Sequence, residues 1–243
     1  MIPPLEFDPQ LVEEAVFAAT RDRPEAASYH QEREASYEER DPEARDLSFR
    51  RLHARWFAKL GLTETLESVV SEHLPALASV RRVLVTRAAA ERQEGAELFV
   101  ADAGERTLIV RIRPATLADR DAALGLLRRE MVYVVDMLDP SFEYEPRLPI
   151  DPAVPGDRML GDRYRLLWGV SVDGRLVRAG KLPEVALERR RDQFQAAFAY
   201  LGGRADVCFD RIAYGPRPDH PRLVALSRDP EDAFSRASHP TAR

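Results

Sequence analysis

The segment LLRREMVYVVDMLDP is a mostly apolar helix that carries side chains able to act as acids, bases or ligands. Glu130, Asp136 and Asp139 supply carboxylates, and Arg129 and Tyr133 supply hydrogen-bond donors. A helix that is apolar nearly all round is buried, and a charge on a buried helix must be paired or face a cleft. We therefore expect the stripe of Arg129, Tyr133 and Asp136 to line a cleft or an internal network of ion pairs.

The spacing of these residues matches a known helix motif in part. The run Arg-Glu-Met-Val-Tyr at 129–133 stands in the frame of the zinc-peptidase motif H-E-x-x-H, with the glutamate retained and both histidines replaced. In the longer motif H-E-x-x-H-x-x-G-x-x-[HD], Asp136 falls on the glycine and Asp139 on the third ligand. Together with the strands expected before this helix, residues 80–145 resemble a zincin-like metallopeptidase in a degenerate form.

The resemblance implies a protein that has lost zinc-peptidase chemistry. In zincins the two histidines bind zinc and the glutamate deprotonates the metal-bound water. The guanidinium of Arg129 stays protonated and cannot be a ligand, and Tyr133 is a poor zinc ligand at neutral pH. Glu130 is then a vestigial general base in a pseudoenzyme that needs no metal or cofactor. Such a protein keeps a cleft for a peptide or protein partner, bound by Arg129, Tyr133, Asp136 and Asp139.

The residues alone leave two other functions open. One is a metal-dependent hydrolase with non-standard ligands, drawn from Glu130, Asp136, Asp139 and His53. The other is a structural or regulatory α+β module, in which Arg129 and Glu130 form a solvated helix edge. Metal analysis separates the hydrolase from the rest, and an open groove beside the helix separates the binding protein from the module.

Charge balance predicts what would stand in for a metal ion. Without zinc, Glu130, Asp136 and Asp139 are neighbouring negative charges, which is costly where water is scarce. We expect the Arg129 guanidinium to pair with Asp136 or Asp139, and the Tyr133 hydroxyl to be a further partner. Asp136 lies about two turns, or roughly 10 Å, along the helix, so only an extended arginine reaches it.

Residues 1–78 are expected to be helical. Asp8 and Asp41, each followed by proline, predict the starts of the first and third helices. The polar segment between them predicts an exposed second helix, and Thr63 is expected to cap a fourth. Within 80–113, the runs VRRVLVTRA, AELFVAD and RTLIVRIR predict three strands of one sheet.

A helix over about residues 116–138 follows, with Thr116 as its cap and Asp119 in the capping-box position. Its apolar face is expected to pack across the sheet. The residues of that face are Leu124, Leu127, Met131 and Val135.

The C-terminal half begins with a proline-rich segment, 140–162, which is long enough to cover a site and equally fits plain surface wrapping. The run YRLLWGVSVDGRLVRAGK predicts a β-hairpin that turns at Asp173-Gly174. A helix over 182–203 is then expected to bury a set of apolar side chains. They are Leu187, Phe194, Phe198 and Leu201.

The fold class is therefore α+β. It has a helical N-terminal part, a small mixed or antiparallel sheet with a central zincin-like helix, then a β-hairpin and a C-terminal helix. We expect a single domain over 1–243, with the helical part at 1–78, the zincin-like part at 79–227 and a frayed tail at 228–243.

Composition limits the partners. The chain has 243 residues and a net charge of -5, so no basic surface is expected to attract nucleic acid. Neither a secretory signal nor an apolar run of membrane-spanning length stands out, which predicts a cytoplasmic protein without a membrane partner. The one cysteine, Cys208, excludes an internal disulfide and is expected to be a small buried side chain. The oligomeric state stays open.

Overall fold

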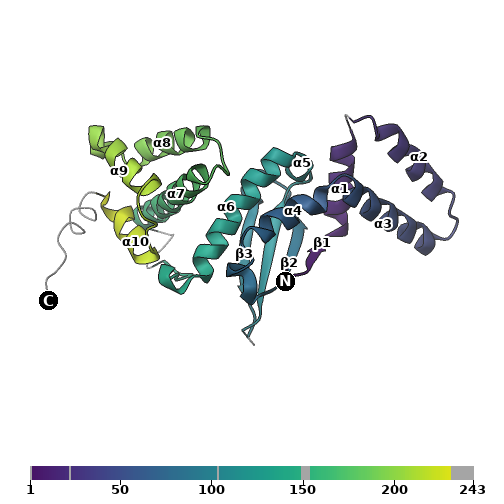
Figure 1. The fold of residues 1–243 in the computed structure, drawn as a ribbon, viewed down its shortest axis with the longest axis horizontal. Coiled ribbons are helices and arrows are strands. Elements are labelled where there is room, and N and C mark those ends of the chain that lie inside the picture. Colours follow the sequence, from purple (N-terminus) through teal and green to yellow (C-terminus); the bar gives the residue numbers. More distant parts are fainter. Residues whose placement is uncertain (1, 22, 103, 149–153, 231–243) are drawn as a thin grey trace. The chain divides into compact units, whose positions relative to one another are not determined.

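The computed structural model describes residues 2–21, 23–102, 104–148 and 154–230 (Figure 1). Contacts within the chain define two compact units, an N-terminal unit (residues 1–134) and a C-terminal unit (residues 135–243). The boundary between them falls inside α6 (Arg120–Leu138). Most of the tail expected to fray lies outside the described residues.

The N-terminal unit contains a mixed four-stranded sheet. Its strands are β1 (Leu5–Phe7), β2 (Val80–Arg87), β3 (Gly95–Val100) and β4 (Arg106–Ile112). They lie in the order β1-β2-β4-β3, with β1 and β4 parallel to β2 and β3 antiparallel to β4. The three strands predicted within 80–113 are confirmed. β1 was not predicted, because three residues carry no readable alternation.

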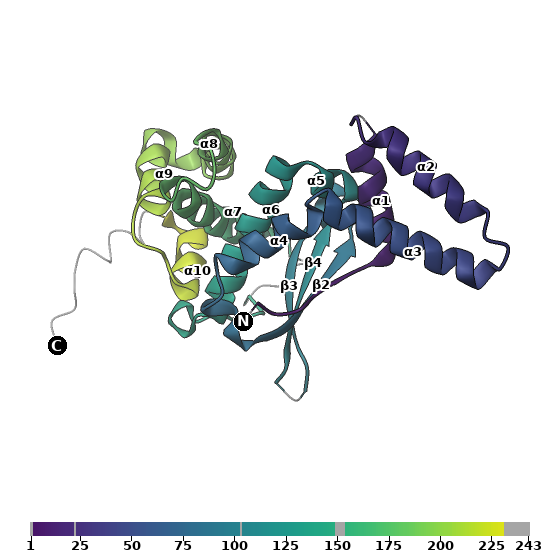
Figure 2. The same cartoon turned by 45° about the vertical axis from the view of Figure 1, so that its right-hand side comes forward.

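Two helices of this unit begin where aspartate precedes proline. Asp8 caps α1 (Pro9–Thr20) through the Gln10 amide, and Asp41 caps α3 (Pro42–Lys59) through the Ala44 amide. α2 (Ala26–Tyr37) lies beside α3, as Figure 2 shows. The prediction that α2 is exposed is wrong at Tyr29, whose side chain is fully buried between α1 and α3.

Two helix starts differ from the prediction. α4 (Leu62–Ser71) begins after Gly61, which takes the left-handed conformation with φ 72°, so Thr63 lies inside the helix and does not cap it. The helix expected to begin at Thr116 is two helices, α5 (Pro114–Ala118) and α6. Asp119 separates them, because its carboxylate accepts hydrogen bonds from the Asp121 and Ala122 amides and so begins a new helix.

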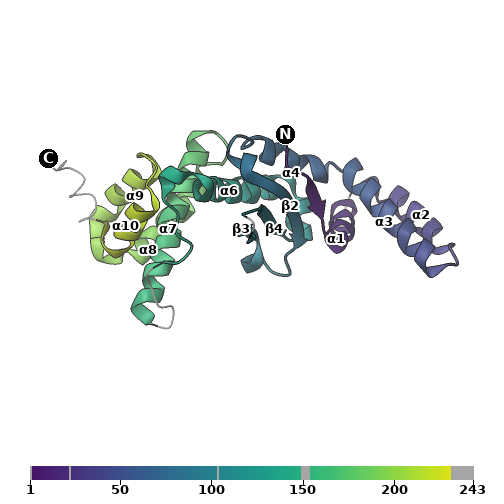
Figure 3. The ribbon, with the colours of Figure 1, turned by 90° about the horizontal axis from the view of Figure 1, so that it is seen from below.

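α6 lies along the sheet near β3, as Figure 3 shows from below. Leu127 and Met131 of its apolar face are buried, and Leu124 and Val135 are half-buried. None of these four side chains is exposed, so the apolar face predicted from the sequence is confirmed. On the sheet itself, Val83, Val85, Leu108 and Val110 are buried.

In the described part of the C-terminal unit, all the regular secondary structure is helical. After the short 3₁₀ turn η3 (Pro140–Phe142), its helices are α7 (Pro155–Arg178), α8 (Val185–Ala197), α9 (Ala205–Ala213) and α10 (His220–Arg228). α8, α9 and α10 all pack on α7. The burial of Phe194 and Cys208 agrees with the sequence.

The predicted β-hairpin at Asp173-Gly174 is wrong, since both residues lie inside α7. α7 is a central helix that other helices cover on several sides, so its apolar residues are not confined to one face. The sequence around Asp173 therefore lacks the periodicity that would have predicted a helix. Asp173 is only 1% exposed, and its carboxylate is bound by the Arg190 side chain of α8 at 2.8 Å. The dipeptide that predicts a turn therefore serves another purpose here: Asp173 forms a buried ion pair, and Gly174 allows close packing of the helix.

Candidate functional site

Glu130 is held against the edge strand of the sheet. Its carboxylate accepts a hydrogen bond from the backbone N–H of Ala96 in β3, at 2.8 Å. Burial raises the pKa of Glu130, while the Ala96 hydrogen bond and the charge of Arg129 act in the opposite direction. The glutamate retained from the motif frame therefore lies half-buried on a strand backbone.

The two motif positions that would hold histidines carry Arg129 and Tyr133, which are both half-buried on α6. A guanidinium offers donors only, and a neutral phenol is a weak metal ligand. Within the described residues, no three His, Cys, Asp or Glu side chains are grouped so that they could hold a metal ion. The residues at this frame therefore do not fit the zinc ion of a zincin.

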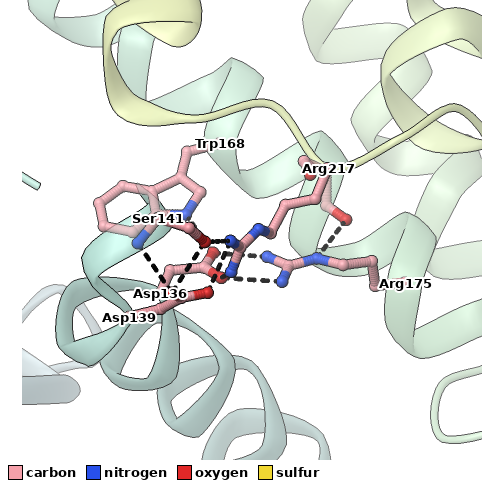
Figure 4. A network of polar contacts seen from close by, with 7 residues as sticks. Asp136, Asp139, Ser141, Trp168, Arg175 and Arg217 are labelled. Atoms are coloured by element: carbon pink, nitrogen blue, oxygen red, sulfur yellow. Dashed lines mark hydrogen bonds and ion pairs between the residues drawn. The ribbon is translucent and has the colours of Figure 1, made fainter. Parts of the chain in front are cut away.

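Asp136 is the centre of a buried ion-pair network in the C-terminal unit (Figure 4). Its side chain is 0% exposed, and both of its oxygens are bound by the Arg175 guanidinium, at 2.8 and 2.5 Å. Arg217 donates to Oδ1 at 3.2 Å, and the indole nitrogen of Trp168 donates to Oδ2 at 2.8 Å. The charge of Asp136 is thus compensated by two arginines and one neutral donor.

Arg217 joins Asp136 to Asp139. One of its terminal nitrogens lies 2.7 Å from Asp139 Oδ2 and donates to the Ser141 hydroxyl at 2.8 Å. Asp139 also accepts hydrogen bonds from the backbone N–H and the hydroxyl of Ser141. These hydrogen bonds and that from Arg217 lower the pKa of Asp139 to about 2. Two of the predicted binding residues therefore share one cation.

Sequence reasoning missed both of these arginines. Charge balance required a cation beside Asp136 and Asp139, but the prediction assigned that role to Arg129. Arg175 lies on α7 and Arg217 precedes α10, so both come from segments far along the chain from Asp136. The pairing of Arg129 with either carboxylate stays a prediction.

Aromatic rings cover this network. Phe142 is fully buried and stacks on Trp168, with 5.1 Å between ring centroids. Tyr144 lies 5.8 Å from the same indole, and the Tyr164 hydroxyl is 2.8 Å from His220 Nδ1. The start of the predicted cover segment 140–162 therefore packs on the aromatic cluster around Trp168, while residues 149–153 lie outside the described residues.

His53, the remaining ligand candidate, lies on α3 in the N-terminal unit. The residue is 4% exposed, and its Nε2 is 3.1 Å from the Tyr29 hydroxyl. Each side chain suggested as a ligand of a non-standard metal site therefore has a different partner within the protein. Glu130 binds a strand amide, Asp136 and Asp139 bind arginine, and His53 binds a phenol.

Comparison with known proteins adds no relative, because no protein-family model, curated protein or solved structure matches this chain. Among the described residues, no helix combines the length and the hydropathy that crossing a membrane requires.

Proposed function

We propose that this protein is a non-catalytic, zincin-like protein that binds an extended peptide along the outer edge of β3. The observation that carries the proposal is the hydrogen bond from the Ala96 N–H to Glu130. It brings the polar side of α6 to the open edge of the sheet. A peptide that adds a strand to a sheet edge gains affinity from main-chain hydrogen bonds and specificity from alternate side chains.

The register of β3 leaves its outward N–H groups available apart from that of Ala96, which Glu130 already binds. The Ala101 N–H donates to the Glu105 carbonyl just beyond the two strands. Every second residue pair of an antiparallel ladder exchanges such hydrogen bonds, so Phe99 and Thr107 are also a hydrogen-bonded pair. The alternate residues Ala96, Leu98 and Val100 then direct their N–H groups outward. Phe99 and Val100 are 58% and 53% exposed, which gives this edge an apolar surface.

The same contacts support a non-catalytic role. Oε2 of Glu130 accepts the Ala96 N–H, which gives this carboxylate a structural contact with the strand backbone. The positions on either side of it in the motif frame carry no imidazole that could bind a metal. Binding of a peptide requires neither a metal nor a free base.

A proline substitution tests the peptide edge. We expect immobilised random-sequence octapeptides to retain the protein, and their addition to shift the amide resonances of residues 96–100. Leu98→Pro removes one outward N–H and should weaken retention by about twofold to tenfold, since a lost hydrogen bond costs roughly 0.5–1.5 kcal/mol. Leu98→Ala keeps the N–H and is the matched control. Equal retention of the proline and alanine variants would contradict the proposal.

Elemental analysis tests the non-catalytic assignment separately. Purified protein incubated with zinc and then desalted is expected to carry no stoichiometric metal that depends on Glu130. Zinc retained by the natural sequence and lost in Glu130→Ala would favour the metal-dependent hydrolase. The same sample assayed with casein would then reveal whether peptide bonds are cleaved.

A further inference from the structure

A pocket of about 670 Å³ lies in the N-terminal unit, away from β3. β1, α1, α2 and α3 supply most of its lining. Phe7, Phe49 and Phe57 give it aromatic walls, and Arg33, Arg50 and His53 give it cationic or hydrogen-bonding groups. Pockets for small organic ligands have this size and this combination of apolar walls with a few polar groups.

His53 is a buried polar side chain in the wall of the pocket. The residue is 4% exposed, and burial lowers the pKa of its ring below the usual 6.5, which favours the neutral form. Nε2 faces the Tyr29 hydroxyl at 3.1 Å, which leaves Nδ1 as the nitrogen for a ligand. When the Tyr29 hydroxyl donates to Nε2, the ring proton sits on Nδ1, and His53 is then a donor.

Arg33 presents a second donor without an acceptor. Its guanidinium lies over the rings of Phe17 and Tyr37, at 4.9 and 5.3 Å from their centroids. Its Nε is buried and has no hydrogen-bond partner within the described part of the chain. A buried donor left unmatched costs free energy, and an acceptor brought by a ligand removes that cost.

The acidic residues of the pocket lie in a different environment. Glu13 and Asp46 belong to its lining but are exposed to solvent, where water and salt weaken their charges. The charge of Glu13 still acts on His53 and opposes the lowering of its pKa by burial. Arg33 is half-buried, so its charge is screened less. The unmet requirement inside the pocket is therefore for an acceptor with negative charge.

We propose that this pocket binds a small organic carboxylate that has a flat apolar body. The carboxylate accepts hydrogen bonds from Arg33 and from Nδ1 of His53, and the apolar body packs against Phe49 and Phe57. Charge-assisted hydrogen bonds to guanidinium orient such a ligand, and the aromatic walls bury its ring. This site is distinct from the β3 edge and does not depend on peptide binding there.

Two probes with the same ring and opposite charge test the inference by calorimetry. Indole-3-acetate is expected to bind, with amide shifts confined to α1, α2 and α3, and tryptamine is expected to bind at least about tenfold more weakly. Tryptamine binding as tightly as indole-3-acetate would overturn the proposal. So would the absence of heat and of shifts with indole-3-acetate at millimolar concentration.

Paired variants locate the site. Arg33→Gln should weaken indole-3-acetate about tenfold to a hundredfold, whereas Arg40→Gln, an exposed arginine outside the pocket lining, should not. Ala54→Trp fills the pocket while it keeps Arg33, and Ala58→Trp, one turn further along α3 and outside the lining, is its control. Circular dichroism checks that each variant is folded. Unchanged affinity in a folded Ala54→Trp variant would place the ligand elsewhere and overturn the assignment.

Discussion

Gly174 of α7 touches the backbone of Ala213 at the end of α9. A Cβ atom added at Gly174 would lie 2.1 Å from the Ala213 carbonyl oxygen, which no real Cβ contact allows. α7 and α9 therefore meet with their backbones in contact, and only glycine fits at this point. Inside a helix this glycine costs conformational entropy, and close packing of the two helices offsets that cost.

Gly174→Ala is expected to destabilise the C-terminal unit by about 1–3 kcal/mol or more, because the two helices must move apart. Urea unfolding followed by circular dichroism measures the loss. Gly156→Ala in the same helix is the control, since nothing lies within 4 Å of its added Cβ. That variant should be unchanged or up to about 1 kcal/mol more stable. Equal effects at the two glycines would show that close packing is not the reason for Gly174.

The sequence predicted elements whose signals are local. RTLIVRIR alternates polar and apolar residues and is strand β4, and Asp8 and Asp41 begin the helices expected of them. The sequence did not predict that Asp173 and Gly174 lie inside a helix. The dipeptide Asp-Gly is typical of a hairpin turn, and the same two residues can also supply a buried ion pair and a glycine at a helix contact. Only the contacts with Arg190 and Ala213 separate the two.

The candidate site was predicted in part for the same reason. The helix periodicity placed Asp136 on a buried stripe that needed a cation, and its side chain is fully buried and paired. The partners could not be read, because Arg175 and Arg217 are 39 and 81 residues away in the chain. A charge-balance argument states that a cation is needed and does not identify it.

Asp136→Asn should cost about 3–5 kcal/mol of unfolding free energy, because it leaves the guanidinium groups of Arg175 and Arg217 without their shared buried anion. Asp139→Asn is the matched control. Its carboxylate is part of the same network but partly exposed, so water replaces the lost pairing and the effect should be smaller. Thermal unfolding of the two variants gives the ranking. A larger loss at Asp139 would show that Asp136 is not the centre of the network.

The buried histidines should make the fold sensitive to acid. Burial lowers the pKa of both His53 and His220 from the usual value of 6.5. As the pH falls, these histidines are therefore protonated in the unfolded chain before they are protonated in the folded protein. Their contribution to stability is complete above pH 6.5 and is lost as the pH falls through the folded pKa values.

Urea unfolding at intervals from about pH 7 to about pH 5 measures this slope. His220→Gln should flatten it, because glutamine takes up no proton. His30→Gln, which changes an exposed side chain, should leave the slope as it is. A slope that is the same in all three proteins would show that His220 does not contribute to the acid sensitivity.

The effect of Glu130 on the pH dependence of stability is opposite to that of the buried histidines. Burial raises its pKa above the usual value of 4.5, so folding favours the protonated carboxyl. The contribution of this group to stability is present below pH 4.5 and is lost as the pH rises through the raised folded pKa. Glutamine mimics the protonated form and its side-chain oxygen still accepts the Ala96 N–H.

Glu130→Gln should therefore match the natural sequence near pH 4 and exceed its stability near pH 8, by about 1.4 kcal/mol for each unit by which folding raises the pKa. Glu94→Gln is the contrasting control, because its buried carboxylate is paired with Arg113 and the same substitution there should destabilise the protein. Urea unfolding at the two pH values measures both variants. A Glu130→Gln variant that is less stable than the natural sequence near pH 8 would contradict this prediction. It would show that the ionised carboxylate stabilises the contact with β3, and an ionised Glu130 is the form that a general base needs.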